Sequence, residues 1–128
     1  MTTLPPHRLE IVLVCPQIAP NTGNIARLAV ATQTPLHLVR PLGFVLSDRQ
    51  LRRSAMDYWP HLQLTLHDDL DSFAKAAAGN RLRLFSSKAA TGLWEADLRD
   101  GDWLVFGNET HGLPAEFLNA HRDSAIRI

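Results

Sequence analysis

The sequence predicts one doubly wound α/β domain, in which helices cover both faces of a parallel β-sheet. Short apolar runs recur along the chain, helix-like segments separate them, and glycine, proline or asparagine marks many of the junctions. Continuous apolar runs are typical of strands that are buried on both faces of a sheet. The 128 residues suit one domain with a substantial core, so we expect a single domain over residues 1–128.

The apolar runs, together with an alternating apolar pattern at residues 62–66, predict six strands. They comprise residues 9–15, 36–39, 62–66, 82–86 and 104–106, and a last strand that begins at residue 126. The first is the most distinct, because it is a continuous run rich in β-branched side chains. The order of strand and helix along the chain favours parallel pairing of the strands.

Helices are expected between these strands. The clearest covers residues 69–78, which have acidic residues in the first turn, Lys75 near the end, and Gly79 and Asn80 as stop signals. Residues 25–32 supply helix-compatible apolar positions, with Asn21 or Thr22 as the expected N-cap. Shorter helices are expected over residues 47–53 and 114–120, the second beginning at a proline.

Composition limits the function classes. Thirteen basic residues balance thirteen acidic ones, so no global charge draws the protein to nucleic acid or membrane. The lone Cys15 excludes an internal disulfide and fits a reducing compartment, and we therefore expect a cytoplasmic protein. One cysteine and six scattered histidines offer no metal-ligand spacing, so no metal is expected.

The segment around residues 103–114 has the pattern of a ligand-binding edge. An apolar run is followed by Gly107 and Gly112, which bracket a polar loop, and then by Pro114. Ligands of open α/β sheets bind at the carboxyl ends of the strands. A tight structural turn explains the same pattern. Glu109 within the loop is either a brace for backbone N–H groups or an acid/base group.

The loop after the first strand contains no G-x-G-x-x-G or P-loop lysine, which argues against a pyrophosphate site. Asn21, Asn24 and Arg27 recur at intervals of three and share one helix face, which we expect to point towards the carboxyl edge of the sheet. They serve a site there, or they act as cap, loop brace and solvated side chain. Arg49, Arg52 and Arg53 form a basic cluster that suits either RNA phosphates or a solvated helix face.

Residues 21–27 and 106–114 together resemble the two motifs of the SPOUT family of trefoil-knotted RNA 2′-O-methyltransferases. The similarity is greatest to the small members that modify the wobble position of tRNA. The resemblance implies a Rossmann-like domain, S-adenosylmethionine as methyl donor, the ribose of the wobble nucleotide in the anticodon stem-loop as acceptor, and a homodimer. The alternatives are a non-catalytic RNA-binding module or an inactive fragment of this fold, and, more remotely, a domain that acts only in protein assembly.

The resemblance also implies roles for individual residues. Arg27 corresponds to the catalytic arginine, with Asn21 and Glu109 as supports of that site. The donor would be held by backbone groups at three positions: Phe85, Gly107 and Ile128. Contacts to RNA would come from Asn24, Arg49, Arg52, Arg53 and His111, although the family usually has arginine or lysine where His111 stands.

The family extends past the position matched by Ile128 by about 30 residues, a length that suits one more loop and a helix. That segment forms the trefoil knot, closes the donor pocket and packs the dimer. The resemblance therefore implies that the C-terminal knot segment is missing from these 128 residues. If these 128 residues are the whole molecule, we expect donor binding and methylation to be crippled and apolar surface to be exposed. If the native protein carries such a segment, the methyltransferase interpretation stands unchanged.

Overall fold

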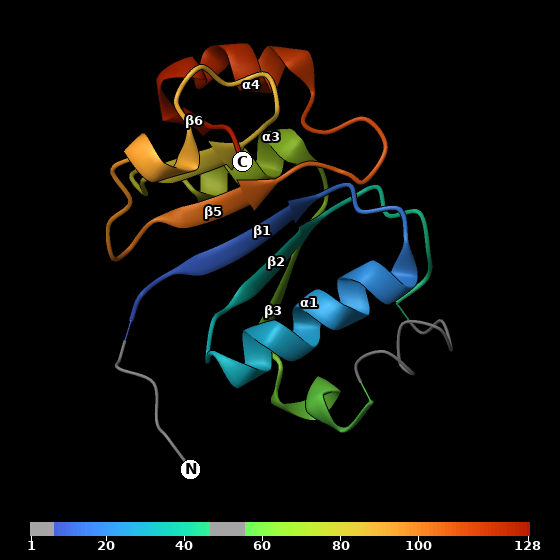
Figure 1. Ribbon diagram of the computed structural model, residues 1–128. Coiled ribbons are helices and arrows are strands. Elements are labelled where there is room, and N and C mark those ends of the chain that lie inside the picture. The colour runs from blue at the N-terminus through green and yellow to red at the C-terminus, as the bar shows by residue number, and fades with distance from the viewer. Residues whose placement is uncertain (1–6, 47–55) are drawn as a thin grey trace.

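The computed structural model describes residues 7–46 and 56–128. Six parallel strands form one sheet in the order β3-β2-β1-β5-β4-β6 (Figure 1). The strands are β1 (Glu10–Val14), β2 (Leu36–Val39), β3 (Leu64–His67), β4 (Leu82–Phe85), β5 (Trp103–Phe106) and β6 (Ala125–Ile126). The strand order reverses between β1 and β5, so this pair is the topological switch point where open α/β sheets bind ligands.

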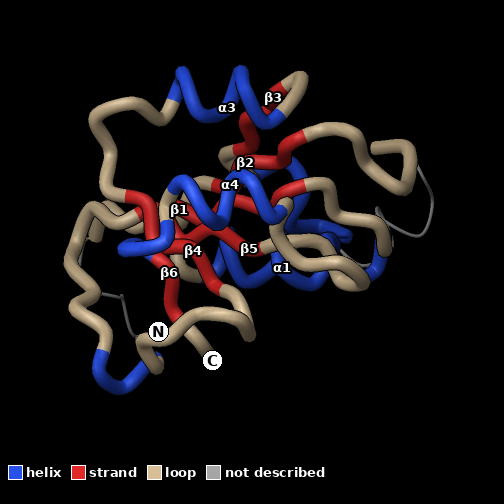
Figure 2. Tube along the Cα trace, turned by 90° about the horizontal axis from the view of Figure 1, so that it is seen from above, coloured by secondary structure: helices blue, strands red, loops and turns tan. Residues whose placement is uncertain are grey.

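Helices cover both faces of the sheet (Figure 1). One face carries α1 (Ala19–Ala31) and the 3₁₀ helix η1 (Met56–His61), and the other carries α3 (Leu70–Ala76) and α4 (Ala115–Ala120). Viewed from above, α4 lies across the central strands (Figure 2). Side chains of β1 alternate between the two faces: Val12 and Val14 belong to the core under α3 and α4, and Leu13 belongs to the core under α1. The predicted fold class is confirmed.

The predicted strands are confirmed with small shifts at their ends. The largest shift is at β3, which begins at Leu64 because η1 and its following turn occupy the residues before it. The 3₁₀ helices were not expected from the sequence. Helix α3 is confirmed, and its N-cap is Asp69, whose carboxylate accepts a hydrogen bond from the Ser72 N–H at 2.7 Å. The helix predicted over residues 47–53 lies outside the described residues.

The prediction for the start of α1 is wrong. The helix begins at Ala19, and its N-cap is Ile18, which makes no side-chain cap hydrogen bond. Asn21 and Thr22 therefore lie within the first turn instead of capping it. Pro20 suits this turn, because its fixed φ is helical and its missing N–H has no intrahelical acceptor there. The N–H groups just before the helix, those of Gln17 and Ile18, donate to a side chain of a distant loop, as described below.

A buried chain of polar side chains links three strands on the α3 side of the sheet. His37 of β2 is hydrogen-bonded through Nε2 to Glu10 at 2.6 Å and through Nδ1 to Nε2 of His67 at 2.9 Å. The ring of His37 stacks on Trp103, and His67 meets Phe73 edge-on. Burial and the nearby His37 lower the pKa of His67 below its ordinary value of 6.5.

This pKa shift predicts acid sensitivity of the fold. The unfolded chain takes up a proton at His67 near pH 6.5, whereas the folded chain does so only at lower pH. The free energy of unfolding should therefore fall as the pH drops below about 6.5. Above that pH His67 is neutral in both states, so the stability should no longer depend on its titration. Urea unfolding at about pH 7.5 and about pH 5.5 measures the change, and His67→Gln should flatten it. An equally steep pH dependence in His67→Gln would contradict the assignment.

None of the helices in the described part of the chain combines the length and the apolar character that crossing a bilayer requires.

Candidate active site

The loop after β5 is held in shape by its own backbone and by Asn108. The backbones of Asn108 and Gly112 exchange two N–H···O hydrogen bonds of 3.2 and 3.1 Å. The side-chain oxygen of Asn108 accepts hydrogen bonds from the N–H groups of Thr110 and His111 at 3.0 and 2.6 Å. Gly112 has a φ of +69°, a conformation that favours glycine. Residues 107–112 thus form a closed, preorganised turn.

Position 107 requires a glycine because the backbone of Gly112 and Leu113 passes too close to it for a side chain. A Cβ atom placed on Gly107 would lie 2.1 Å from the carbonyl carbon of Gly112 and 2.3 Å from the nitrogen of Leu113. No side chain fits at this distance, so any substitution must open the turn.

This turn forms one wall of a cavity of about 700 Å³ at the carboxyl ends of β4 and β5. The three residues that the resemblance assigns to the donor, Phe85, Gly107 and Ile128, all line it. Phe85 and Phe106 stack with their ring centroids 4.7 Å apart, and Leu118 adds a further apolar side chain. The volume falls in the range of small-molecule sites, which combine apolar walls with a few polar groups. His111 also lines the cavity and is exposed.

Glu109 connects the cavity loop to α1. Its carboxylate accepts hydrogen bonds from the backbone N–H groups of Gln17 at 3.0 Å and Ile18 at 2.6 Å. These N–H groups precede the first helical turn, where a negative charge is stabilised by the helix dipole. In this structure Glu109 is the loop brace, one of the two roles considered from the sequence. It joins the two motif-bearing segments, which lie at opposite ends of the chain.

Removing this brace should loosen the start of α1. We expect Glu109→Ala to lower the free energy of unfolding by about 1 kcal/mol, the usual effect of losing a helix N-cap acceptor. Glu109→Gln keeps one acceptor oxygen and should lose less. Urea unfolding measures the stability, and faster hydrogen exchange at the Ile18 amide should locate the change. Glu95→Ala, which removes an exposed carboxylate on η2 (Leu93–Glu95), is the control. Unaltered exchange at Ile18 in Glu109→Ala would show that the brace is not formed in solution.

The motif at residues 21–27 lies on α1, and Asn21, Asn24 and Arg27 are exposed on this helix. Asn24 and Arg27 line a depression of about 370 Å³ together with Leu28, Ala31 and Tyr58. The guanidinium carbon of Arg27 lies 5.4 Å from the centre of the Tyr58 ring. Asn21 is exposed in the first helical turn and does not line this depression.

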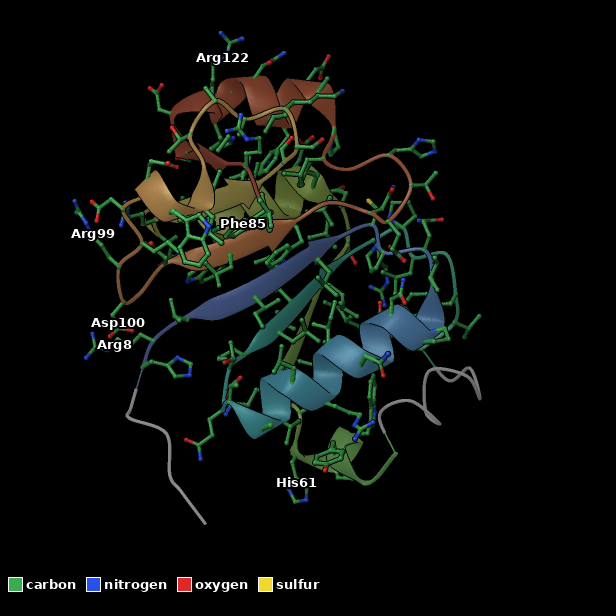
Figure 3. The ribbon with its side chains drawn as sticks, viewed as in Figure 1. Arg8, His61, Phe85, Arg99, Asp100 and Arg122 are labelled. Atoms are coloured by element: carbon green, nitrogen blue, oxygen red, sulfur yellow. The ribbon has the colours of Figure 1, made fainter. Side chains whose placement is uncertain are left out.

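The expectation that the shared face of Asn21, Asn24 and Arg27 points towards the carboxyl edge holds only for the start of the helix. The helix begins at that edge and runs back along the sheet (Figure 1). A rise of 1.5 Å per residue puts Arg27 roughly 12 Å along the axis from Ala19. Within one chain, Arg27 and the Gly107 cavity are therefore in different depressions. Figure 3 labels one residue near each depression. Phe85, which lines the cavity beside Gly107, lies at the sheet, and His61, at the end of the η1 helix that carries Tyr58, lies beyond α1.

The remaining candidates from the sequence are a basic cluster, the lone cysteine and metal ligands. Arg49, Arg52 and Arg53 lie outside the described residues. Burial raises the pKa of the Cys15 thiol, which opposes a nucleophilic role for that residue. Over residues 7–46 and 56–128, no group of three histidine, cysteine or acidic side chains could hold a metal ion. Sequence reasoning missed Tyr58 as a neighbour of Arg27, because nothing in the spacing of the two residues predicts their contact.

A model of the family described as "SpoU rRNA Methylase family" matches residues 8–128. The chain belongs to the SpoU methylase family. Within it, a putative tRNA (cytidine(34)-2′-O)-methyltransferase of Synechocystis is 47% identical over 108 residues, which cover 83% of this chain and 71% of that protein. The tRNA (cytidine(34)-2′-O)-methyltransferase of Saccharophagus degradans is 46% identical over 120 residues, which cover 93% of this chain and 78% of that protein.

Solved structures agree with this assignment. A structure described as giving insight into 2-OH methylation of C/U34 on tRNA superposes with a TM-score of 0.90 at 47% identity, over 95% of this chain and 80% of that one. An AdoMet-bound rRNA methyltransferase from Sinorhizobium meliloti has a TM-score of 0.82 at 22% identity, over 94% of this chain and 47% of that one. At that lower identity the likeness shows the fold alone. The predicted family is confirmed.

Proposed function

We propose that this SpoU methylase is a tRNA 2′-O-ribose methyltransferase, which transfers a methyl group from S-adenosylmethionine to the wobble nucleotide, position 34 of the anticodon loop. The observation that carries the proposal is the 47% identity and 0.90 TM-score to the protein studied for methylation of C/U34, over 95% of this chain. Relatives named as cytidine-34 2′-O-methyltransferases support the same substrate.

We assign the donor to the cavity beside Gly107. Its stacked Phe85 and Phe106 rings and the aliphatic Ile128 suit the adenine and ribose of S-adenosylmethionine, and the backbone of the glycine turn suits their polar edges. The donor carries no phosphate, which agrees with the lack of a phosphate-binding loop in the sequence. Bound there, the donor supplies an already activated methyl group on a sulfonium. The protein then has mainly to align that methyl with the acceptor hydroxyl.

Arg27 is assigned to the acceptor. A guanidinium keeps its proton at ordinary pH, so Arg27 is a poor general base. Its N–H groups can instead orient the ribose 2′-hydroxyl and stabilise the negative charge that develops on the oxygen during attack. The proton then passes to water or to an RNA phosphate. Asn24 lines the same depression and can hydrogen-bond the nucleotide, and Glu109 supports the beginning of the helix that carries both residues. We assign Asn21, which is exposed in the first turn of that helix, to the same site.

The remaining RNA contacts are assigned by charge. We propose that Arg49, Arg52, Arg53 and His111 contact the backbone of the anticodon stem-loop. Because tRNA is the substrate, the proposed location is the cytoplasm.

The separation of Arg27 from the donor cavity within one chain supports a homodimer. We propose that Arg27 of one protomer faces the Gly107 cavity of the other, so that each active site uses both chains. Light scattering coupled to size-exclusion chromatography should then give twice the chain mass. A monomer that is fully active would overturn this part of the proposal.

A methyl-transfer assay tests the function. Donor labelled in the methyl group is incubated with unmodified tRNA, and position 34 is then examined for ribose methylation by mass spectrometry of nuclease fragments. We expect label at that ribose, and none when the tRNA already carries a 2′-O-methyl group at position 34. Salt-dependent binding of tRNA without consumption of donor would instead indicate a non-catalytic RNA-binding module.

A further inference from the structure

The side chain of Arg27 has an aromatic neighbour on a different element. The guanidinium carbon lies 5.4 Å from the centroid of the Tyr58 ring, within the 6 Å range of an attractive cation–π contact. Among the side chains that the structure describes, no carboxylate lies within ion-pair distance of Arg27. The ring of Tyr58 is thus the described group best placed to orient this guanidinium.

Tyr58 is fixed by the core although its own side chain is exposed. Its neighbour Trp59 packs against the hydrophobic core under α1, together with Leu62. The Leu62 N–H donates to the Trp59 carbonyl at 3.1 Å, and the Leu36 N–H of β2 donates to the Gln63 carbonyl at 2.9 Å. These contacts attach η1 to the sheet beside α1. The position of the Tyr58 ring relative to Arg27 is therefore set by buried neighbours.

We propose that Tyr58 is a positioning residue for methyl transfer, which holds the guanidinium of Arg27 in the orientation that the acceptor hydroxyl requires. The inference rests on the proposed function, because it assumes that Arg27 acts on that hydroxyl. A long exposed arginine side chain populates many rotamers, and only some of them would place the guanidinium beside the acceptor hydroxyl. Stacking on a fixed ring selects the orientation before the substrate arrives. The contact uses the ring face, so the phenolic oxygen is not needed for it.

Two variants at Tyr58 separate the ring from its hydroxyl. Tyr58→Phe keeps the stacking surface, and Tyr58→Leu replaces the ring with a smaller aliphatic side chain that has no π face. We expect Tyr58→Leu to lower kcat about fivefold, the rate change that corresponds to the loss of one exposed cation–π contact, with the KM for S-adenosylmethionine unchanged. Tyr58→Phe should keep most of the turnover. Trp94→Leu, which removes a 93% exposed aromatic ring from η2, is the matched control and should behave as wild type.

A second readout does not depend on activity. In a ¹⁵N–¹H spectrum, the side-chain Nε–H of Arg27, assigned by its loss in Arg27→Lys, should be displaced upfield by the ring current of Tyr58. The displacement should persist in Tyr58→Phe and vanish in Tyr58→Leu. An Arg27 signal that is the same in wild type and Tyr58→Leu would overturn the contact itself.

The kinetic outcomes decide the role. If Tyr58→Leu turns over at the wild-type rate while the Arg27 signal moves, stacking occurs but does not position a reacting group, and the proposal fails. If only the KM for tRNA rises, Tyr58 contacts RNA directly, and the positioning role is again wrong. If the wild-type protein transfers no methyl group at all, the proposed function fails, and the ring-current shift still reports whether the two side chains stack.

Discussion

Replacement of Arg27 by alanine should lower kcat for methyl transfer to tRNA by about 100-fold or more. Removal of one donor that stabilises a developing oxyanion typically costs a factor of 10² to 10³. Donor binding should be unaffected, because Arg27 does not line the Gly107 cavity of its own chain and its proposed contact across the dimer is with the acceptor hydroxyl. Single-turnover assays with saturating tRNA measure the chemical step, and calorimetry with S-adenosylmethionine measures donor binding.

Arg27→Lys provides the sharper comparison. Lysine keeps the positive charge but loses the planar fork of N–H donors and the broad surface that stacks on Tyr58. We expect this variant to remain far below wild type in kcat while binding tRNA with nearly unchanged salt dependence. Near-normal turnover by Arg27→Lys would show that charge alone suffices, and would contradict the role assigned to the guanidinium.

The parts of the fold that could be predicted are those encoded by local pattern. Strands buried on both faces are typically apolar runs, and such runs are visible at β1 and β5, whereas β2 is apolar except for the buried His37. Helix α3 has its own cap in Asp69 and its own stop signal in Gly79, so its limits follow from neighbouring residues. The three positions proposed to hold the donor, Phe85, Gly107 and Ile128, came from the family resemblance, since backbone groups at these positions carry no chemical signature of their own.

The parts that failed depend on contacts between distant residues. The start of α1 was misplaced because the residues just before it, Gln17 and Ile18, donate their backbone N–H groups to Glu109, which is 91 residues away from Ile18 in the sequence. Ile18 makes no side-chain cap hydrogen bond that could mark the start, and the local pattern favours Asn21 or Thr22 as the cap instead. The contact between Arg27 and Tyr58 arises in the same way, from the packing of η1 beside α1, and no spacing rule anticipates it.

Replacement of Gly107 by alanine should abolish most donor binding. The added Cβ would meet the Gly112 carbonyl carbon at 2.1 Å, so the turn must move by more than 1 Å to restore ordinary contact. Misplacement of a positioning element by about 1 Å can cost 100-fold in rate, and we expect a fall of this order in kcat/KM for the donor. Calorimetry with S-adenosylmethionine measures the loss, and circular dichroism verifies that the variant remains folded.

Gly79→Ala is the matched control for this variant. Gly79, unlike Gly107, has a left-handed conformation, with a φ of +88°, but nothing lies within 4 Å of a Cβ placed there. This substitution should therefore cost about 1 kcal/mol of stability from backbone strain alone, and leave donor binding intact. If Gly79→Ala impairs donor binding as much as Gly107→Ala does, general destabilisation explains both results and the Gly107 turn is not part of the donor site.

The two inactive variants together test how the site is assembled. In a dimer that pairs an Arg27→Ala chain with a Gly107→Ala chain, one site would combine an intact Arg27 with an intact cavity if each site uses both protomers. Random exchange of subunits should then recover about a quarter of wild-type activity, since half of the dimers are mixed and each has one complete site. If each site were built within a single chain, every site in the mixture would carry one defect. The mixture would then be no more active than its components, and the shared active site would be ruled out.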